Sequence, residues 1–216
     1  MAQPPATISL RTRRTLAERS NETRGLLLDA TIESLIDRGY RDTTTTDVVR
    51  RAGLTRGAQV HHFPRKIELV QAATLHLTRK VREELHLQAA RLTPGQSRAD
   101  AAIALLWSTY TGPLFWAALE LIVAGRTDEE LRPALTSLQE EVGRTLHEFC
   151  KDLFGPGEEG NRALYDAIDL SIRFMDGLAL AGILKDGEWR DRLLEKWSKL
   201  VRPLFEEAEC SLPLDT

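Results

Sequence analysis

Hydrophobic residues recur along the chain at helical spacing, and no long Val/Ile/Thr alternation of the strand type interrupts them. Asn21 is the expected cap of a first helix, whose apolar face includes Leu27, Leu28 and Leu35. This helix runs to about Arg38, where Gly39 supplies a left-handed stop. Later helices are expected at about 97–111, 113–125, 128–154, 161–184 and 187–209. The pattern predicts an all-α protein.

Two short helices are expected after Gly39. Thr44 and Asp47 form a capping pattern for the first, which ends at Gly53, where a turn needs positive φ. Thr55 caps the second, over about 56–62. Two short helices joined by a tight turn containing glycine are typical of a helix-turn-helix.

Proline and threonine mark further helix starts. Pro64 fits the first turn of a long helix that continues to about Leu92. Thr127 and Glu130 form another capping pattern, which predicts a helix start near residue 128.

The second short helix offers one face for contact with DNA. Four residues of this helix are expected to point outward: Arg56, Gly57, Val60 and His61. Gln59 and Phe63 share the opposite face, and Phe63 anchors the helix. Arginine reads guanine in the major groove, and valine contacts the thymine methyl group. The backbone N–H groups of Thr45 and Thr46 and the ammonium of Lys66 are expected to bind phosphates.

This stretch resembles the tetracycline-repressor (TetR) family of transcriptional regulators. The resemblance rests on Leu27-Leu28-Asp29-Ala30, Arg38-Gly39-Tyr40, Thr44, Arg51-Ala52-Gly53-Leu54, Arg56-Gly57-Ala58, His61-His62-Phe63-Pro64 and Lys66-Ile67-Glu68-Leu69. It implies a homodimer in which each subunit has a three-helix DNA-binding head and a helical body for ligand binding and dimerisation. A bound ligand would shift the heads out of register with DNA. The family's DNA contacts carry over to Thr45, Thr46, Arg56, Gly57, Val60, His61, His62 and Lys66.

Two positions depart from the family pattern. Gln59 stands where the family has an apolar residue, and a buried amide needs partners, so Gln59 is expected to turn toward the edge. Val60 stands where the family has a tyrosine that reaches phosphate, a contact that valine cannot make. His61 or His62 is expected to compensate.

The sequence divides into a basic, flexible arm at 1–20, a head at 21–66 and a body at 67–216. The first 66 residues carry 12 Lys and Arg against 7 Asp and Glu, whereas the remainder carries 17 against 25. A basic head on an acidic body fits a head that meets a polyanion. The alternative is chance, because the excess is small.

An aromatic group in the body suggests where a small-molecule effector binds. Trp107, Tyr110, Phe115 and Trp116 surround a helix break at Gly112-Pro113, and Phe174 is a further candidate. The alternative is ordinary core packing, and only the family resemblance favours an effector site. The last two helices are rich in apolar residues, which fits either a dimer interface or burial within one subunit.

Composition and missing motifs limit the other functions. The 216 residues contain two cysteines and no expected membrane helix or signal peptide, so the simplest location is the cytoplasm. No cofactor or metal is expected, because zinc-ligand spacing, GxSxG, GxGxxG and HExxH are absent. The expected function is a repressor released from a palindromic double-stranded DNA operator by a small-molecule effector. The rivals are a helical small-molecule enzyme and a non-specific DNA-binding protein, and an activator is a variant of the main interpretation.

Overall fold

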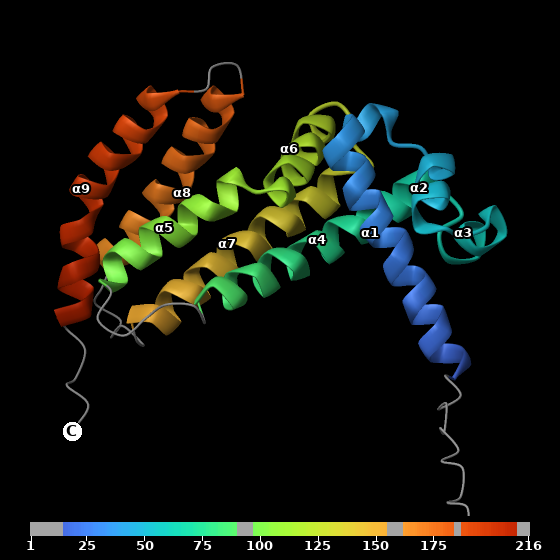
Figure 1. Ribbon diagram of the computed structural model, residues 1–216, viewed down its shortest axis with the longest axis horizontal. Helices are drawn as coiled ribbons and strands as arrows, with labels where there is room; N and C mark the ends of the chain where they lie inside the picture. Colours follow the sequence, from blue (N-terminus) through green and yellow to red (C-terminus); the bar gives the residue numbers. More distant parts are fainter. Residues whose placement is uncertain (1–14, 90–96, 155–161, 184–186, 211–216) are drawn as a thin grey trace, which may run out of the picture.

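The computed structural model describes residues 15–89, 97–154, 162–183 and 187–210, and these residues form helices and turns with no strand (Figure 1). The helices are α1 (Leu16–Asp42), α2 (Thr45–Ala52), α3 (Arg56–His62), α4 (Lys66–Ala89), α5 (Arg98–Thr111), α6 (Pro113–Gly125), α7 (Arg132–Phe154), α8 (Arg162–Gly182) and α9 (Glu188–Cys210). The predicted all-α class is confirmed.

The helices form a head and a body joined by one long helix (Figure 1). Helices α1, α2 and α3 lie at one end, and α4 runs from there into the body beside α7. Helices α8 and α9 pair with each other at the opposite end, where both also contact α5. The first half of α1 extends away from the body.

The head does not have a separate hydrophobic core. One cluster of buried side chains joins Leu35 of α1, Val48 of α2 and Phe63 to Val70 of α4 and Leu121 of α6. The head is therefore packed directly against α4, α6 and the start of α7. The division into a head and a body at residue 66 stays a prediction.

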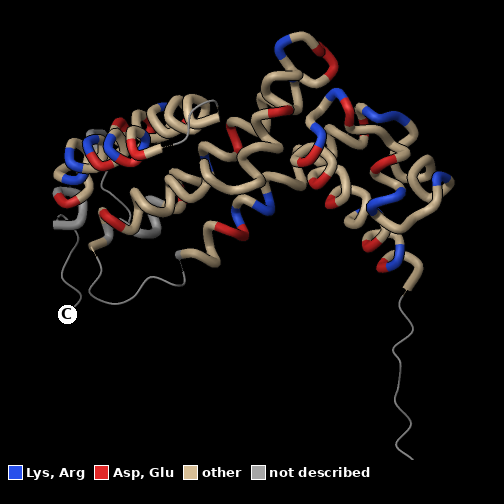
Figure 2. Tube along the Cα trace, turned by 45° about the horizontal axis from the view of Figure 1, so that its top comes forward, with Lys and Arg blue, Asp and Glu red and all other residues tan. Residues whose placement is uncertain are grey.

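A second cluster fills the body. Its fully buried members include Leu106 of α5, Ile168 and Met175 of α8 and Phe205 of α9. Charged residues interleave along α9 (Figure 2), whereas α6 carries a single charged residue, Glu120. Burial of apolar side chains therefore makes the main contribution to the stability of the body, as it does in helical bundles.

Several helix ends differ from the sequence prediction. Helix α1 begins at Leu16, because Thr15 and Glu18 form a reciprocal capping box, and Asn21 lies inside the helix. The prediction of a flexible arm as far as residue 20 is therefore wrong for Leu16–Ser20, and residues 1–14 lie outside the described range. The stop at Gly39 has the expected positive φ of 74°, but a last helical turn follows it to Asp42.

Two predicted helix starts after the head also differ from the structure. Helix α4 begins at Lys66, two residues after Pro64, and its predicted end at Leu92 falls outside the described residues. The capping pattern at Thr127 is wrong, because Asp128 Oδ1 accepts the backbone N–H groups of Glu130 and Leu131 before α7. The short aspartate side chain thus closes the turn before α7, which begins at Arg132.

Within the described residues, no single helix has the length and apolar character to cross a membrane. One pair, Ala99–Thr111 with Pro113–Gly125, meets that test jointly, with a 60° bend between its halves.

Candidate DNA-binding surface and effector region

The turn between α2 and α3 is built by three local signals. Thr44 caps α2 by accepting the N–H of Asp47 at 3.1 Å, and Thr55 caps α3 by accepting the N–H of Ala58 at 3.2 Å. Gly53 has φ 65° and ψ 28°, a left-handed conformation that glycine adopts at little cost. The helix-turn-helix predicted from the sequence is confirmed.

Helix α3 presents the predicted residues to solvent. Arg56, Gly57, Val60 and His61 are exposed, whereas Phe63 is buried against the head's core. The guanidinium of Arg24 lies 5.3 Å above the Phe63 ring, which adds a cation–π contact to this anchor. The outward face has the arrangement that a recognition helix needs, and contact of these residues with DNA stays a prediction.

Gln59 corrects one expectation. Its side chain is 1% exposed, so it lies on the inward face and does not turn toward the edge. Its Nε2 donates to the carbonyl of Phe63, at the position where the helix ends, while its Oε1 is buried with no partner in the part of the chain that the structure describes. The amide therefore serves as a C-terminal cap for α3 and leaves one acceptor unsatisfied.

The predicted phosphate-binding residues differ in how exposed they are. Thr46 is exposed, and Thr45 is half-buried, with its hydroxyl 3.4 Å from the Arg56 guanidinium. His62 is half-buried, and its pKa is lowered by burial first and then by the nearby charges of His61 and Arg24. His62 is therefore favoured in its neutral form, in which the ring has one donor nitrogen and one acceptor.

Lys66 has an intramolecular role in this structure. Its ammonium donates to the Tyr40 carbonyl at 2.9 Å and lies 4.5 Å from the centre of the Tyr40 ring. Burial lowers its pKa, although Asp128 and Asp42 act in the opposite direction. These contacts compete with the predicted phosphate contact of Lys66.

A buried carboxylate that the sequence prediction missed supports the helix-turn-helix. Asp47 is 8% exposed and accepts from Arg50 at 2.5 Å and from Arg51 at 2.7 Å. Ser34 of α1 donates to the same carboxylate at 3.0 Å, and Arg38 lies 3.5 Å away. Hydrogen bonds from Arg50 and then Arg51 hold the pKa of Asp47 well below its usual range. Only the capping pattern marked Asp47 in the sequence, and that pattern does not reveal partners on α1.

Tyr40 fastens the head to the body. Its N–H donates to Glu120 of α6 at 3.1 Å, and its hydroxyl donates to Asp128 Oδ2 at 2.8 Å. Burial and this carboxylate raise the pKa of Tyr40. A Cβ atom on the preceding Gly39 would lie only 2.6 Å from Glu120 Oε2, so the glycine permits the close approach of α1 to α6.

The contact between Tyr40 and Asp128 gives a testable coupling. Tyr40→Phe should lower the free energy of unfolding by about 1.5–3 kcal/mol, because the lost hydrogen bond has a charged acceptor. Asp128→Asn removes the charge but keeps Oδ1 as the acceptor for the N–H groups of Glu130 and Leu131. Urea unfolding of both single variants and the double variant then isolates this one contact. Additive losses would show that the hydroxyl and the carboxylate do not interact.

The predicted effector residues fall into two aromatic groups. Tyr110, Phe115 and Trp116 form a chain of edge-to-face contacts with centroid distances of 5.3 and 5.2 Å. Phe174 instead stacks on Trp197 at 4.6 Å. Trp197 of α9 belongs to this region but is not among the predicted effector residues, because its stacking partner lies on another helix.

The remaining contacts of this region combine packing and charge. Trp107 is half-buried and has the guanidinium of Arg190 5.8 Å from its ring. Tyr110 is buried, and its pKa is raised by burial and by the negative charge of Asp176. Burial also raises the pKa of Asp176, although Arg173 opposes this at 3.1 Å. Most of the aromatic side chains belong to the body's core or pack against it, so effector binding there stays a prediction.

The geometry agrees with known proteins. The family model described as bacterial regulatory proteins, tetR family, matches residues 27–73, which include α2 and α3. An uncharacterised HTH-type transcriptional regulator of Mycobacterium tuberculosis is 26% identical over 189 residues, covering 87% of this chain and 97% of that protein. The HTH-type transcriptional regulator CymR of Pseudomonas putida is 36% identical over 123 residues, covering 57% of this chain and 61% of CymR.

The fold has a counterpart among solved structures. A transcriptional regulator from Rhodococcus superposes with a TM-score of 0.63 at 20% identity, covering 88% of this chain and 99% of that one. Together with the exposed helix α3, these matches define a helix-turn-helix transcriptional regulator and not an enzyme. Residues 27–73 thus match the family model of the tetR regulators, and most of the chain is similar to an HTH-type transcriptional regulator.

Proposed function

We propose that this chain is a homodimeric repressor that binds a near-palindromic operator and is released from it by a small-molecule effector. The observation that carries the proposal is the outward face of α3, where Arg56, Gly57, Val60 and His61 are exposed together. In a dimer, the two copies of α3 would lie about 34–36 Å apart, or a multiple of this, in successive major grooves.

The effector is proposed to bind in the aromatic region of the body. Phe115 and Trp116 lie in the first turn of α6, and Glu120 lies further along the same helix, where it accepts the N–H of Tyr40. A ligand that displaces the start of α6 would therefore act on the contact that fastens the head. This arrangement supports a two-state response in which effector and DNA favour different head positions.

A gel shift with the DNA upstream of the chain's own gene tests the proposal. We expect a shift that is selective for sequence and weakens as salt increases, because both base edges and phosphates are contacted. A shift that unrelated DNA abolishes equally well would instead support the non-specific binding protein. Mass spectrometry of compounds that purify with the chain would identify the effector class.

The roles of Arg56 and Thr46 can be separated by substitution. Arg56→Ala should cost about 1–3 kcal/mol at one base position and relax selectivity there, because a bidentate contact to guanine is lost. Thr46→Pro removes one phosphate-binding N–H near the start of α2 and should weaken all sequences alike. Binding to a set of operators with single base changes distinguishes the two patterns. Uniform losses in both variants would contradict the assignment of Arg56 to base recognition.

Lys66→Ala gives a further comparison, because the sequence predicts a phosphate contact and the structure shows a contact with Tyr40. A uniform loss of affinity with unchanged stability would support the phosphate contact. A loss of stability with little change in the salt dependence of binding would support the structural role.

A further inference from the structure

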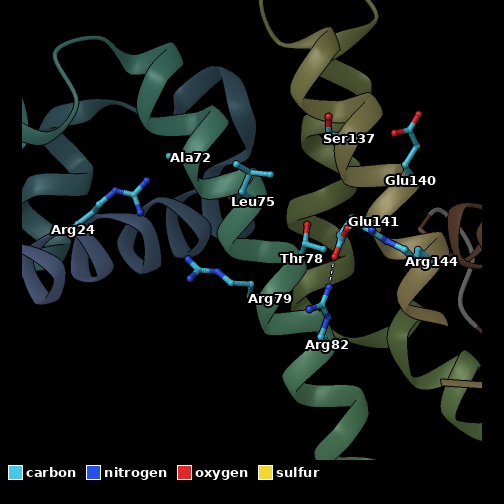
Figure 3. Close-up of a pocket in the computed structure, with 10 residues that line it drawn as sticks. All are labelled: Arg24, Ala72, Leu75, Thr78, Arg79, Arg82, Ser137, Glu140, Glu141 and Arg144. Carbon is cyan, nitrogen blue, oxygen red and sulfur yellow. Dashed lines mark hydrogen bonds and ion pairs between the residues drawn. The ribbon is translucent and has the colours of Figure 1, made fainter. Parts of the chain in front are cut away.

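A hollow of about 600 Å³ lies along the outer face of α4, between α1 and α7 (Figure 3). It is separate from the aromatic region, with which it shares no lining residue. Ala72 and Leu75 of α4 contribute apolar surface, and the Leu75 side chain is exposed. The hollow thus combines an apolar surface with a rim of charged side chains.

Four arginines line this hollow, but only two of them have a carboxylate partner among the described residues. Arg82 and Arg144 both pair with Glu141 of α7. Arg24 of α1 and Arg79 of α4 form no ion pair within the described part of the chain. Figure 3 shows both guanidinium groups extended into the space between α1 and α4. Arg24, which also lies over the Phe63 ring, and Arg79 therefore bring two positive charges to the lining of one hollow.

Arg79 is held in this position by a chain of hydrogen bonds. Its Nη2 donates to His76 Nδ1 at 2.9 Å, and His76 Nε2 donates to Asp29 Oδ1 of α1 at 2.8 Å. Lys80 donates to the same Asp29 oxygen at 2.9 Å. A guanidinium ordered by a neutral imidazole has lost part of its side-chain entropy before a ligand arrives, which favours binding.

The chemistry of the hollow selects an anion with an apolar part. A guanidinium presents planar, paired donors that match a carboxylate, and it is more weakly hydrated than an ammonium. Ala72 and Leu75 offer surface to a hydrocarbon group at the same time. We propose that the hollow binds a small amphipathic carboxylate between Arg24 and Arg79, with its hydrocarbon part against Ala72 and Leu75.

Such a ligand would join the head to the body, because Arg24 belongs to α1 and Arg79 to α4. Its occupancy would then alter how freely α1 moves relative to α4. This regulatory consequence rests on the proposed repressor function, whereas binding itself does not.

Octanoate is a suitable probe, titrated calorimetrically into the full chain. We expect saturable binding of octanoate, and no comparable binding of the uncharged octanol or the cationic octylammonium. Arg24→Ala and Arg79→Ala should each weaken octanoate binding about tenfold or more. Arg79→Lys should bind with intermediate affinity, because it keeps the charge but loses the planar fork. Arg126→Ala, which removes an exposed arginine outside the hollow, is the matched control and should bind as the wild type does.

Three results would overturn the site. The first is the absence of saturable octanoate binding, and the second is equal binding of octanol. The third is an octanoate affinity that neither alanine variant lowers, which would place the probe in the aromatic region or elsewhere. Circular dichroism verifies that the variants remain folded. Gel shifts with the wild-type chain test the repressor separately, because Arg24 also contacts Phe63, the anchor of α3. DNA binding without octanoate binding rejects only the hollow, and octanoate binding without selective DNA binding rejects only the repressor.

Discussion

Replacement of Asp47 by asparagine should destabilise the chain by about 3 kcal/mol or more, because it removes a buried charged acceptor that Arg50, Arg51 and Ser34 share. Asp47 is the common partner of Arg50 and Arg51, and it also accepts the hydroxyl of Ser34. It therefore fastens α2 to α1 as well as neutralising its own helix. The measurement is the free energy of unfolding in urea, with helical circular dichroism as the probe.

Asp37→Asn is the matched control. Asp37 pairs with the same Arg51 at 2.7 Å but is 57% exposed, so its loss should cost less than about 1 kcal/mol. Equal losses in the two variants would show that burial does not distinguish the two ion pairs.

The same carboxylate should make the head sensitive to acid. The pKa of Asp47 is held below the value of an unfolded aspartate, which is about 3.9. Its contribution to stability is therefore complete above about pH 4 and is lost as the pH falls toward its folded pKa. The unfolding free energy of Asp47→Asn should accordingly fall less steeply below pH 4 than that of the wild type.

Local signals explain why the helix-turn-helix could be predicted from sequence. Thr44, Gly53 and Thr55 each act on backbone groups within a few residues, so their effect does not depend on the rest of the fold. Pro113 likewise occupies the first turn of α6, where its missing N–H has no helical acceptor to lose. The predicted ranges of α3 and α6 agree with the structure for this reason.

The errors have different physical causes. The first turns of α1 are exposed, so the hydrophobic pattern that starts near Leu27 does not mark them, although Thr15 and Glu18 do. Gln59 was expected at the edge because it is polar, but the helical spacing to Phe63 directs it inward. In the first case the capping pattern, and in the second the helical spacing, gave the correct position, whereas the polarity of the residues did not.

Contacts between distant segments were beyond the reach of sequence patterns. Tyr40 meets Glu120 and Asp128, which lie 80 and 88 residues further along the chain. Arg24 and Arg79 of the hollow come from different helices, and their convergence depends on how α1 crosses α4. Such sites depend on tertiary packing, which cannot be predicted from the local patterns of a single sequence.

Leu200→Glu should reduce operator affinity by about 10²–10⁴-fold, because it should separate the proposed dimer and remove simultaneous binding of two half-sites. Leu200 is 70% exposed on α9, and Leu170 of α8 is 59% exposed, whereas Ile168 of α8 and Phe205 of α9 are fully buried within the subunit. Burial therefore accounts for one face of these helices, and a dimer interface on the exposed face stays a prediction. A Cβ on Gly177 of α8 would meet no atom within 4 Å, so a partner helix can approach closely there.

Binding to DNA with one half-site and to DNA with two half-sites distinguishes a loss of dimerisation from a loss of base recognition. Leu200→Glu leaves α3 intact, so its affinity for a duplex with one half-site should equal that of the wild type, while its advantage on the full operator disappears. Sedimentation should show a monomer at concentrations where the wild type is a dimer. Leu87→Glu, at an exposed leucine of α4, adds the same charge away from α8 and α9 and should change neither result. A dimeric Leu200→Glu variant with full operator affinity would place the interface on another face, because an introduced carboxylate cannot be buried against its symmetry copy without a large cost.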